Sequence, residues 1–216
     1  MTDLANKLRE GAALLGVDLD DQAIDRLLRL LEMLEKWNAV YNLTALRDRE
    51  SWVTAHLLDS LSLVPHLQGE RFLDVGTGPG FPGLPAAIAR PDTEWILLDS
   101  NQKKTAFASQ VAAELKLTNV TVQQSRVEGF QPVAPFDGVV SRAFSDIGDF
   151  ARLTAHLLHA DGWLFAMKGR LSPEEMTHVD PVRFRIRIEP LVVPGLAGER
   201  HLVLLQPVKF EESARQ

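Results

Sequence analysis

The sequence predicts an α/β protein whose doubly wound, mostly parallel sheet follows a helical cap. After Gly69, short apolar runs alternate with helical stretches, and a glycine-dense turn directly follows the first run. Such alternation implies parallel strands joined by right-handed crossovers. Before Gly69 the apolar residues recur at helical spacing instead. We therefore expect a cap over residues 1–68 and an α/β domain over residues 69–210, packed as one compact unit.

Two helices are expected in the cap. Between residues 20 and 38, apolar side chains recur three and four positions apart, which is the spacing along one face of a helix. These side chains are Ile24, Leu27, Leu28, Leu31, Leu34 and Trp37. A second helical stretch covers residues 51–67, and a loop at residues 41–44 joins the two.

Apolar runs predict the strands. Five of these runs are interpreted as buried strands of the parallel sheet: residues 72–75, 95–98, 120–123, 138–140 and 163–167. Two later runs, at residues 184–188 and 201–205, are joined by the turn-rich segment 193–198. This arrangement favours an antiparallel pair that closes the sheet.

Composition excludes several classes of protein. The 216 residues include no cysteine, which excludes disulfides, thiolate metal sites and cysteine nucleophiles, and the six histidines have no metal-ligand spacing. The first residues have no secretory pattern, and no apolar run approaches the roughly 18 residues that span a bilayer. We therefore expect a cytoplasmic protein with no metal and no membrane contact. A net charge of −6 leaves RNA binding to local basic patches.

The segment 72–83 predicts a nucleoside-binding turn. A strand runs into Gly76, Gly78 and Gly80, and a helix with a proline in its first turn follows. Glycine permits positive φ and close approach to a ligand, and free N–H groups at the helix start favour a ligand carboxylate or phosphate. Asp99 ends the next strand, where a carboxylate can accept hydrogen bonds from both ribose hydroxyls.

Two other interpretations of this turn stay open. It can be a tight structural turn without a ligand, and residues 78–83 also match the Gly-x-Gly-x-x-Gly fingerprint of nicotinamide and flavin enzymes. The order of strand, loop, helix, strand and acid makes the first less probable. Against the second, Asp74 lies two positions before the first of three alternating glycines, and Pro82 falls where a dinucleotide site needs its helix to begin.

Further motifs, taken together with the glycine turn, resemble one family. In chain order they are Lys-Trp-Asn (36–38), Tyr-Asn-Leu-Thr (41–44), His-Leu-Leu-Asp-Ser-Leu (56–61), Asp-Val-Gly-Thr-Gly-Pro-Gly-Phe-Pro-Gly (74–83), Leu-Asp-Ser (98–100), Ser-Arg-Val-Glu (125–128), Ser-Arg-Ala-Phe (141–144) and Lys-Gly (168–169). The chain resembles the bacterial small-subunit ribosomal RNA methyltransferase G family, also called glucose-inhibited division protein B. The resemblance covers roughly residues 36–205.

The resemblance implies a seven-stranded class I methyltransferase-like sheet and transfer of a methyl group from S-adenosylmethionine to guanine N7 of 16S ribosomal RNA. The expected partner is this RNA or the small ribosomal subunit, and the expected state is a monomer. Eight residues are implied at the cofactor: Gly76, Gly78, Gly80, Phe81, Asp99, Val127, Glu128 and Arg142. In this picture Asp99 takes the ribose, Val127 and Glu128 flank the adenine, and Arg142 lies at the reactive end.

Methyl transfer to guanine N7 does not require a general acid or base. Guanine N7 carries a free lone pair at neutral pH, so methyl transfer depends mainly on alignment. Residues 141–144 also lack the acceptor-Pro-Pro-aromatic segment that base-amine methyltransferases often carry, which argues against an exocyclic amine target. Arg142 and Lys168 are the expected catalytic residues. Arg142 can donate to a guanine edge or a phosphate, but a structural ion pair is an alternative, and Phe144 can stack on a base or belong to the core.

Candidate RNA contacts are Asn42, His56, Lys168 and Arg170. The last two follow a parallel strand, on the side where ligands bind in such folds. His56 shares a helix face with Asp59 and Ser60, so these residues contact RNA or, equally well, join the helix to the α/β domain. Asn42 can instead order its loop, and the alternating arginines 183, 185 and 187 are more simply a solvated edge.

Two rival functions remain from the sequence. A small-molecule methyltransferase on the same fold would act without RNA. A non-catalytic ribosome- or RNA-binding module would bind the cofactor or the RNA without transfer.

Overall fold

The computed structural model describes residues 2–46, 48–142, 144 and 146–208. Ala143 of the expected 141–144 motif and residues 209–210 of the expected α/β domain lie outside this part of the chain. Seven strands form one sheet: β1 Arg71–Val75, β2 Glu94–Asp99, β3 Val120–Gln124, β4 Phe136–Ser141, β5 Leu158–Lys168, β6 Phe184–Pro190 and β7 His201–Pro207. Their order is β3-β2-β1-β4-β5-β7-β6.

The strand directions confirm the predicted doubly wound sheet. β1 to β5 pair in parallel, whereas β7 is antiparallel to both β5 and β6. The chain order reverses between β1 and β4, because β2 and β3 lie on one side of β1 and the later strands on the other. Ligands bind in such sheets beyond the carboxyl ends of the strands at this switch point.

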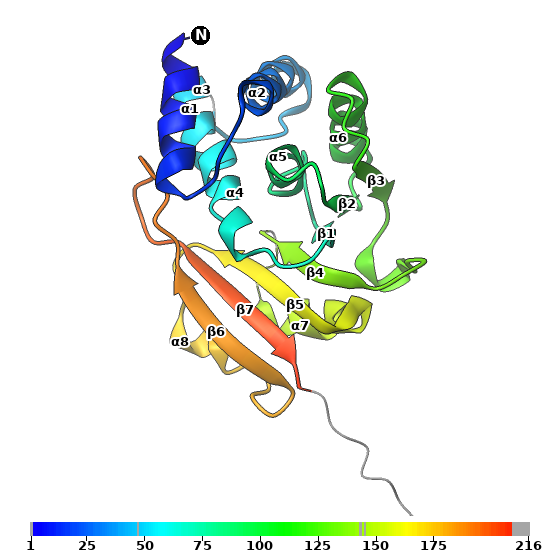
Figure 1. Ribbon diagram of the computed structural model, residues 1–216. Coiled ribbons are helices and arrows are strands. Elements are labelled where there is room, and N and C mark those ends of the chain that lie inside the picture. The colour runs from blue at the N-terminus through cyan, green and yellow to red at the C-terminus, as the bar shows by residue number, and fades with distance from the viewer. Residues whose placement is uncertain (1, 47, 143, 145, 209–216) are drawn as a thin grey trace, which may run out of the picture.

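Helices cover both faces of the sheet (Figure 1). On one face lie α5 Gly83–Ala89 and α6 Gln102–Glu114, and the N-terminal helices pack over them. On the other face lie α7 Ile147–Thr154 and α8 Pro173–Met176. Each face has its own hydrophobic core, with Trp95 and Phe107 buried in the first and Phe136 and Phe150 in the second. Among the described residues, no helix is long and apolar enough to cross a membrane.

The N-terminal region contains α1 Thr2–Leu14, which the sequence pattern did not predict, and α2 Asp21–Tyr41, which it did. Asp20 begins α2 by accepting the N–H of Ala23 at 2.7 Å. Asn42 ends it in the left-handed conformation, with φ of 50°. The apolar face of α2 is buried against the same core as α5 and α6.

The predicted second helix is broken into four pieces. These are α3 Arg49–Trp52, a π-helix at Val53–Leu58, α4 Asp59–Leu61 and a 3₁₀ turn at Val64–His66. Apolar periodicity cannot distinguish a π turn from an α turn over six residues, so the helical extent was predicted but not its winding. π turns are frequent at functional sites.

One prediction about burial is wrong. Residues 120–123 were expected to form a buried strand, but β3 has no buried residue, and Thr121, Gln123 and Gln124 are exposed. The physical reason is position: β3 is an edge strand that pairs only with β2. The later pair, β6 and β7, is antiparallel as predicted.

Candidate functional site

The glycine loop between β1 and α5 is organised around Asp74. One carboxylate oxygen, Oδ2, accepts hydrogen bonds from Thr77 Oγ1 at 2.6 Å and from the Gly83 N–H at 2.8 Å. Gly76 and Gly78 take the left-handed conformation, with φ of 71° and 60°. A Cβ at Gly78 would meet no atom within 4 Å, so this side of the loop is open to a ligand.

The loop does not present a row of free N–H groups, contrary to the expectation from the sequence. Between residues 76 and 83, each residue that carries an N–H donates it within the protein. The acceptors are Leu98 O for Gly76 and Thr77, Asp99 Oδ2 for Gly78, Thr77 O for Gly80 and Phe81, and Asp74 Oδ2 for Gly83. Pro79 and Pro82 have no N–H to offer. A ligand here is therefore held by side chains, carbonyls and shape more than by a helix N-terminus.

A cavity of about 310 Å³ opens at the carboxyl ends of β1 and β2. Its lining residues are Val75, Gly76, Leu98, Asp99, Ser100, Ser125, Arg126, Val127, Glu128, Phe144 and Leu153. Four of the residues expected at a cofactor line it: Gly76, Asp99, Val127 and Glu128. The fold thus brings together the ends of three strands and the 3₁₀ turn Val127–Gly129 at one cavity. Gly78, Gly80, Phe81 and Arg142 are not among its lining residues.

Asp99 is fixed by backbone hydrogen bonds on both oxygens. Oδ2 accepts from the Gly78 N–H and Oδ1 from the Asn101 N–H, each at 2.8 Å. A carboxylate has about four lone-pair positions, so these two bonds leave acceptor capacity on the side that faces the cavity.

Phe81 and Arg142 lie together, outside the lining of this cavity. The Arg142 guanidinium is 5.7 Å from the centre of the Phe81 ring, and its Nη1 donates to Ala55 O at 3.3 Å and to Asp59 Oδ2 at 3.0 Å. The His56 ring stacks on the Phe81 ring, with the two ring centres 4.9 Å apart. Ala55 of the π-helix and Asp59, the first residue of α4, therefore orient Arg142, and the pair with Asp59 corresponds to the ion-pair alternative for this arginine.

His56 is buried and holds the loop before the π-helix. Its Nε2 lies 3.0 Å from Thr44 Oγ1, and the Thr44 N–H donates to Asn38 Oδ1 at 2.9 Å. Burial, and then the positive charge of Arg142, lower the pKa of His56 to about 4, while Asp59 opposes the shift. The imidazole is therefore neutral near pH 7. The hydrogen bond of His56 therefore lies within the helical region, and its contact with the α/β domain is the stacking on Phe81.

Asp74 titrates in the opposite direction. Burial raises its pKa to about 6, although the hydrogen bonds from Thr77 and Gly83 favour the charged form. Its second oxygen, Oδ1, is buried without a hydrogen-bond partner among the described residues. The carboxylate thus organises the loop at an energetic cost near neutral pH.

Lys168 lies at the end of β5, and its ammonium group is engaged. Nζ donates to Phe144 O at 3.1 Å and pairs with Glu175 of α8. The two charged side chains are only 13% and 14% exposed. Lys168 therefore connects α8 to the segment after β4, whose Phe144 lines the cavity and packs on Phe150. Arg170, two residues later, is exposed.

The remaining candidates lie outside the cavity. Asn42 is the exposed residue that ends α2, as the loop-ordering alternative requires. Arg183, Arg185 and Arg187 are exposed along the start of the edge strand β6. In the described part of the chain, no group of three histidine, aspartate or glutamate side chains could hold a metal ion.

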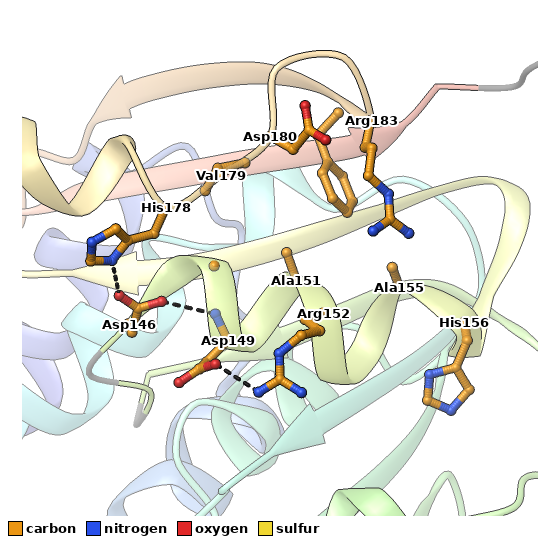
Figure 2. Close-up of a pocket in the computed structure, with 12 residues that line it drawn as sticks. Asp146, Asp149, Ala151, Arg152, Ala155, His156, His178, Val179, Asp180 and Arg183 are labelled. Carbon is orange, nitrogen blue, oxygen red and sulfur yellow. Dashed lines mark hydrogen bonds and ion pairs between the residues drawn. The ribbon is translucent and has the colours of Figure 1, made fainter.

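A larger cavity, of about 510 Å³, lies between α7 and residues 178–184 (Figure 2). None of the residues expected at the cofactor lines it. Asp146 pairs there with His178 and accepts the N–H of Asp149 at 2.8 Å, which begins α7. The hydrogen bond with Asp146 raises the pKa of His178. These exposed contacts join the segment after α8 to α7.

Arg200 is a functional candidate that sequence reasoning did not find. Its Nε donates to Asp59 Oδ1 at 3.0 Å, so Asp59 binds Arg142 and Arg200 at once. Arg200 and Asp59 are 141 residues apart in the chain. No local pattern around Arg200 indicates this contact.

Comparison with known proteins decides the family. The family model described as rRNA small subunit methyltransferase G matches residues 23–203. The chain belongs to this family. A ribosomal RNA small subunit methyltransferase G from Chromobacterium violaceum is 50% identical, over 94% of this chain and 98% of the relative. The relative of that name from Pseudomonas paraeruginosa is 52% identical, over 94% and 95%.

Solved structures show the same fold at low identity. The O-methyltransferase TomG from Streptomyces achromogenes, in complex with SAM, has a TM-score of 0.60 and 16% identity over 89% of this chain and 92% of that one. Precorrin-6y C5,15-methyltransferase from Geobacter metallireducens has a TM-score of 0.56 and 15% identity over 78% and 92%. The predicted class I methyltransferase-like fold and the predicted S-adenosylmethionine-dependent methyltransferase of the G family are confirmed.

Proposed function

We propose that this member of the rRNA small subunit methyltransferase G family transfers a methyl group from S-adenosylmethionine to N7 of a guanine in 16S ribosomal RNA. The observation that carries the proposal is the cavity of about 310 Å³ at the switch point of the sheet, lined by Gly76, Asp99, Val127 and Glu128. The RNA target is supported by the names of relatives about half identical in sequence. Action in the cytoplasm as a monomer is part of the same proposal.

The residues of this cavity fit a nucleoside-bearing cofactor. Asp99 offers carboxylate oxygens to ribose hydroxyls, and Glu128 offers a second acid beside Val127, where the adenine is proposed to lie. Leu98, Phe144 and Leu153 provide apolar surface for a flat ring. Gly78 belongs to the adjoining loop and is proposed to leave room for the methionine end. A side chain at Gly80 would instead clash with Leu84, so Gly80 is proposed to let the loop pack closely on α5. When bound, S-adenosylmethionine supplies an electrophilic methyl group on a sulfonium.

The chain's own part in the reaction is alignment. Guanine N7 needs no general base, so the residues have to hold the base in line with the methyl group and exclude water. Arg142 is proposed as the catalytic residue that donates to the guanine edge or to a neighbouring phosphate. Asp59, Ala55 O and the Phe81 ring fix its guanidinium. Lys168 is proposed to contribute by holding Phe144 against the cavity.

RNA is proposed to approach across the strand ends. Arg170 is exposed directly after β5, and Asn42 is exposed at the end of α2. Both can reach phosphate groups, which position RNA without reading its sequence. His56 is buried, so its contribution to RNA binding is proposed to be indirect, through the loop at Thr44.

The experiment that tests the function is methylation of RNA by the purified protein. The protein is incubated with labelled S-adenosylmethionine and small-subunit particles from cells that lack the enzyme, and the RNA is mapped by mass spectrometry. Label at one guanine N7 is the expected result. Cofactor binding without label in RNA would contradict the proposal and favour a small-molecule substrate or a non-catalytic binder.

A further inference from the structure

Asp59 joins two arginines that come from distant parts of the chain. Its Oδ2 accepts from Arg142 Nη1 and its Oδ1 from Arg200 Nε, both at 3.0 Å. Arg142 directly follows β4, and Arg200 directly precedes β7. Each carboxylate oxygen therefore anchors one guanidinium, and the two cations are held near each other beside the same carboxylate.

The Asp59 side chain is buried, whereas the side chains of the two arginines are partly exposed. The Asp59 side chain is 5% exposed, whereas those of Arg142 and Arg200 are 26% and 30% exposed. A buried carboxylate is costly unless cations pair with it. Asp59 is thus covered by the arginines and faces them, and only the arginines reach the surface at the strand ends.

Both arginines keep donors after binding Asp59. The hydrogen bonds of Arg142 in the described part of the chain all use Nη1, and those of Arg200 use Nε and Nη1. Since a guanidinium has five N–H donors in one plane, the remaining donors of each arginine are oriented by its anchor. One carboxylate therefore sets the directions of two donor groups.

The local backbone supports this arrangement. Asp59 follows the π-helix Val53–Leu58, and its N–H donates to Thr54 O and His56 O. Ala55 O of the π-helix also accepts from Arg142, so the π-helix and the first residue of α4 together hold this guanidinium at two points. A carbonyl and a carboxylate four residues apart thus point at one arginine.

We propose that Asp59 is a positioning residue for methyl transfer, which orients the donors of Arg142 and Arg200 toward acceptor oxygens of the RNA substrate. The inference rests on the proposed function, because it concerns the same site. Asp59 itself does not touch the substrate. Its effect appears only through the two arginines, and that dependence distinguishes it from a residue that merely stabilises the fold.

The test compares kcat/KM for the small-subunit particle in Asp59→Asn, Arg200→Gln and the double variant. Asparagine keeps the size of the side chain but offers one acceptor oxygen, so one guanidinium loses its anchor. Because small misplacements of aligned groups are costly, kcat/KM is expected to fall roughly tenfold to a hundredfold in Asp59→Asn. The loss in the double variant is expected to be smaller than the product of the two single losses, because both changes disrupt the Asp59–Arg200 pair.

Two measurements separate positioning from folding. The Kd for S-adenosylmethionine is expected to stay within about threefold of the wild type, because Asp59 does not line the cofactor cavity. Asp21→Asn is the matched control: it breaks an exposed Asp–Arg pair, Asp21 with Arg9 at 2.6 Å, and neither residue lines the cofactor cavity. Its kcat/KM is expected to equal that of the wild type.

The possible outcomes are distinct. An unchanged kcat/KM in Asp59→Asn, or losses that multiply in the double variant, would overturn the inference while leaving the proposed function intact. A wild-type protein that never labels RNA overturns the proposed function itself. If Asp59→Asn does not fold, Arg200→Gln alone decides: the inference requires a fall in its kcat/KM of about tenfold, with the cofactor Kd preserved.

Discussion

Asp99 Oδ2 accepts the backbone N–H of Gly78 at 2.8 Å, so the carboxylate that ends β2 fixes the glycine loop that follows β1. The same carboxylate lines the cavity of about 310 Å³. One residue therefore shapes the loop and faces the proposed cofactor. This double role explains why the loop can present its open side at Gly78 although its N–H groups are already paired.

Asp99→Ala is expected to weaken cofactor binding more than the loss of one ligand contact implies. The variant removes a proposed acceptor for the ribose and also frees the Gly78 and Asn101 N–H groups. Hydrogen bonds to charged groups contribute about 1.5–3 kcal/mol each, so the Kd is expected to rise at least about tenfold. Calorimetric titration with S-adenosylmethionine measures it, and exposed Asp18→Ala is the control. Equal Kd values for Asp99→Ala and the wild type would contradict this role.

Asp74→Asn is expected to change how stability depends on pH. Burial raises the pKa of Asp74 from 3.8 to about 6. Between these values the folded protein keeps a proton that the unfolded chain has lost, so the free energy of unfolding falls as pH rises. The fall is about 3 kcal/mol across the window. Urea unfolding of the wild type and the variant is measured from about pH 4 to pH 7. The difference between the two pH profiles gives the contribution of Asp74 to the free energy of unfolding. Identical slopes in both proteins would show that Asp74 does not titrate in this window.

His56→Gln is expected to change the pH dependence of the free energy of unfolding in the direction opposite to that of Asp74→Asn. Burial and the charge of Arg142 lower the pKa of His56 from 6.5 to about 4. Between these values the unfolded chain binds a proton that the folded protein does not, so His56 contributes stability that is lost as pH falls through this window. The contribution is about 3 kcal/mol, close in size and opposite in sign to that of Asp74.

The two titrations are therefore expected to offset each other in the wild type. In the same urea series, and relative to the wild type, the stability of His56→Gln shifts toward a fall with rising pH because Asp74 remains, and that of Asp74→Asn shifts toward a rise because His56 remains. Exposed Asp18→Asn serves as the control and keeps the wild-type profile. Parallel profiles for the two site variants would contradict the assignment.

Glu175→Gln is expected to destabilise the protein. The variant leaves the ammonium of Lys168, whose side chain is 13% exposed, without its carboxylate. Breaking a buried ion pair on one side costs about 3–5 kcal/mol, whereas an exposed pair contributes about 0–1 kcal/mol. Glu35→Gln, which breaks the exposed pair of Glu35 with Arg49, is the matched control. Urea unfolding compares the two, and a similar small loss in both would mean that Lys168 does not depend on Glu175.

Much of the fold could be read from local patterns. Apolar runs and helical spacing depend on residues within a few positions of each other, so they predicted the seven strands, α2 and the late antiparallel pair. The glycine turn and the acid at the end of the next strand are also local, and they predicted Gly76 and Asp99 at a nucleoside site. The family resemblance implied Val127 and Glu128 there as well, and all four residues line one cavity. Local patterns were sufficient to predict these cavity residues because the residues lie at or next to the ends of strands that are themselves predictable.

Other features arose only where distant segments meet. The exposure of β3 follows from its place at the sheet edge, and the pairing of the loop N–H groups follows from Asp74, Leu98 and Asp99 closing around it. The link from Arg200 through Asp59 to Arg142 joins the start of α4, the segment after β4 and the loop before β7. Ion pairs, edge exposure and π winding carry no sequence period, because they depend on which side chains the folded strands and loops bring within contact distance.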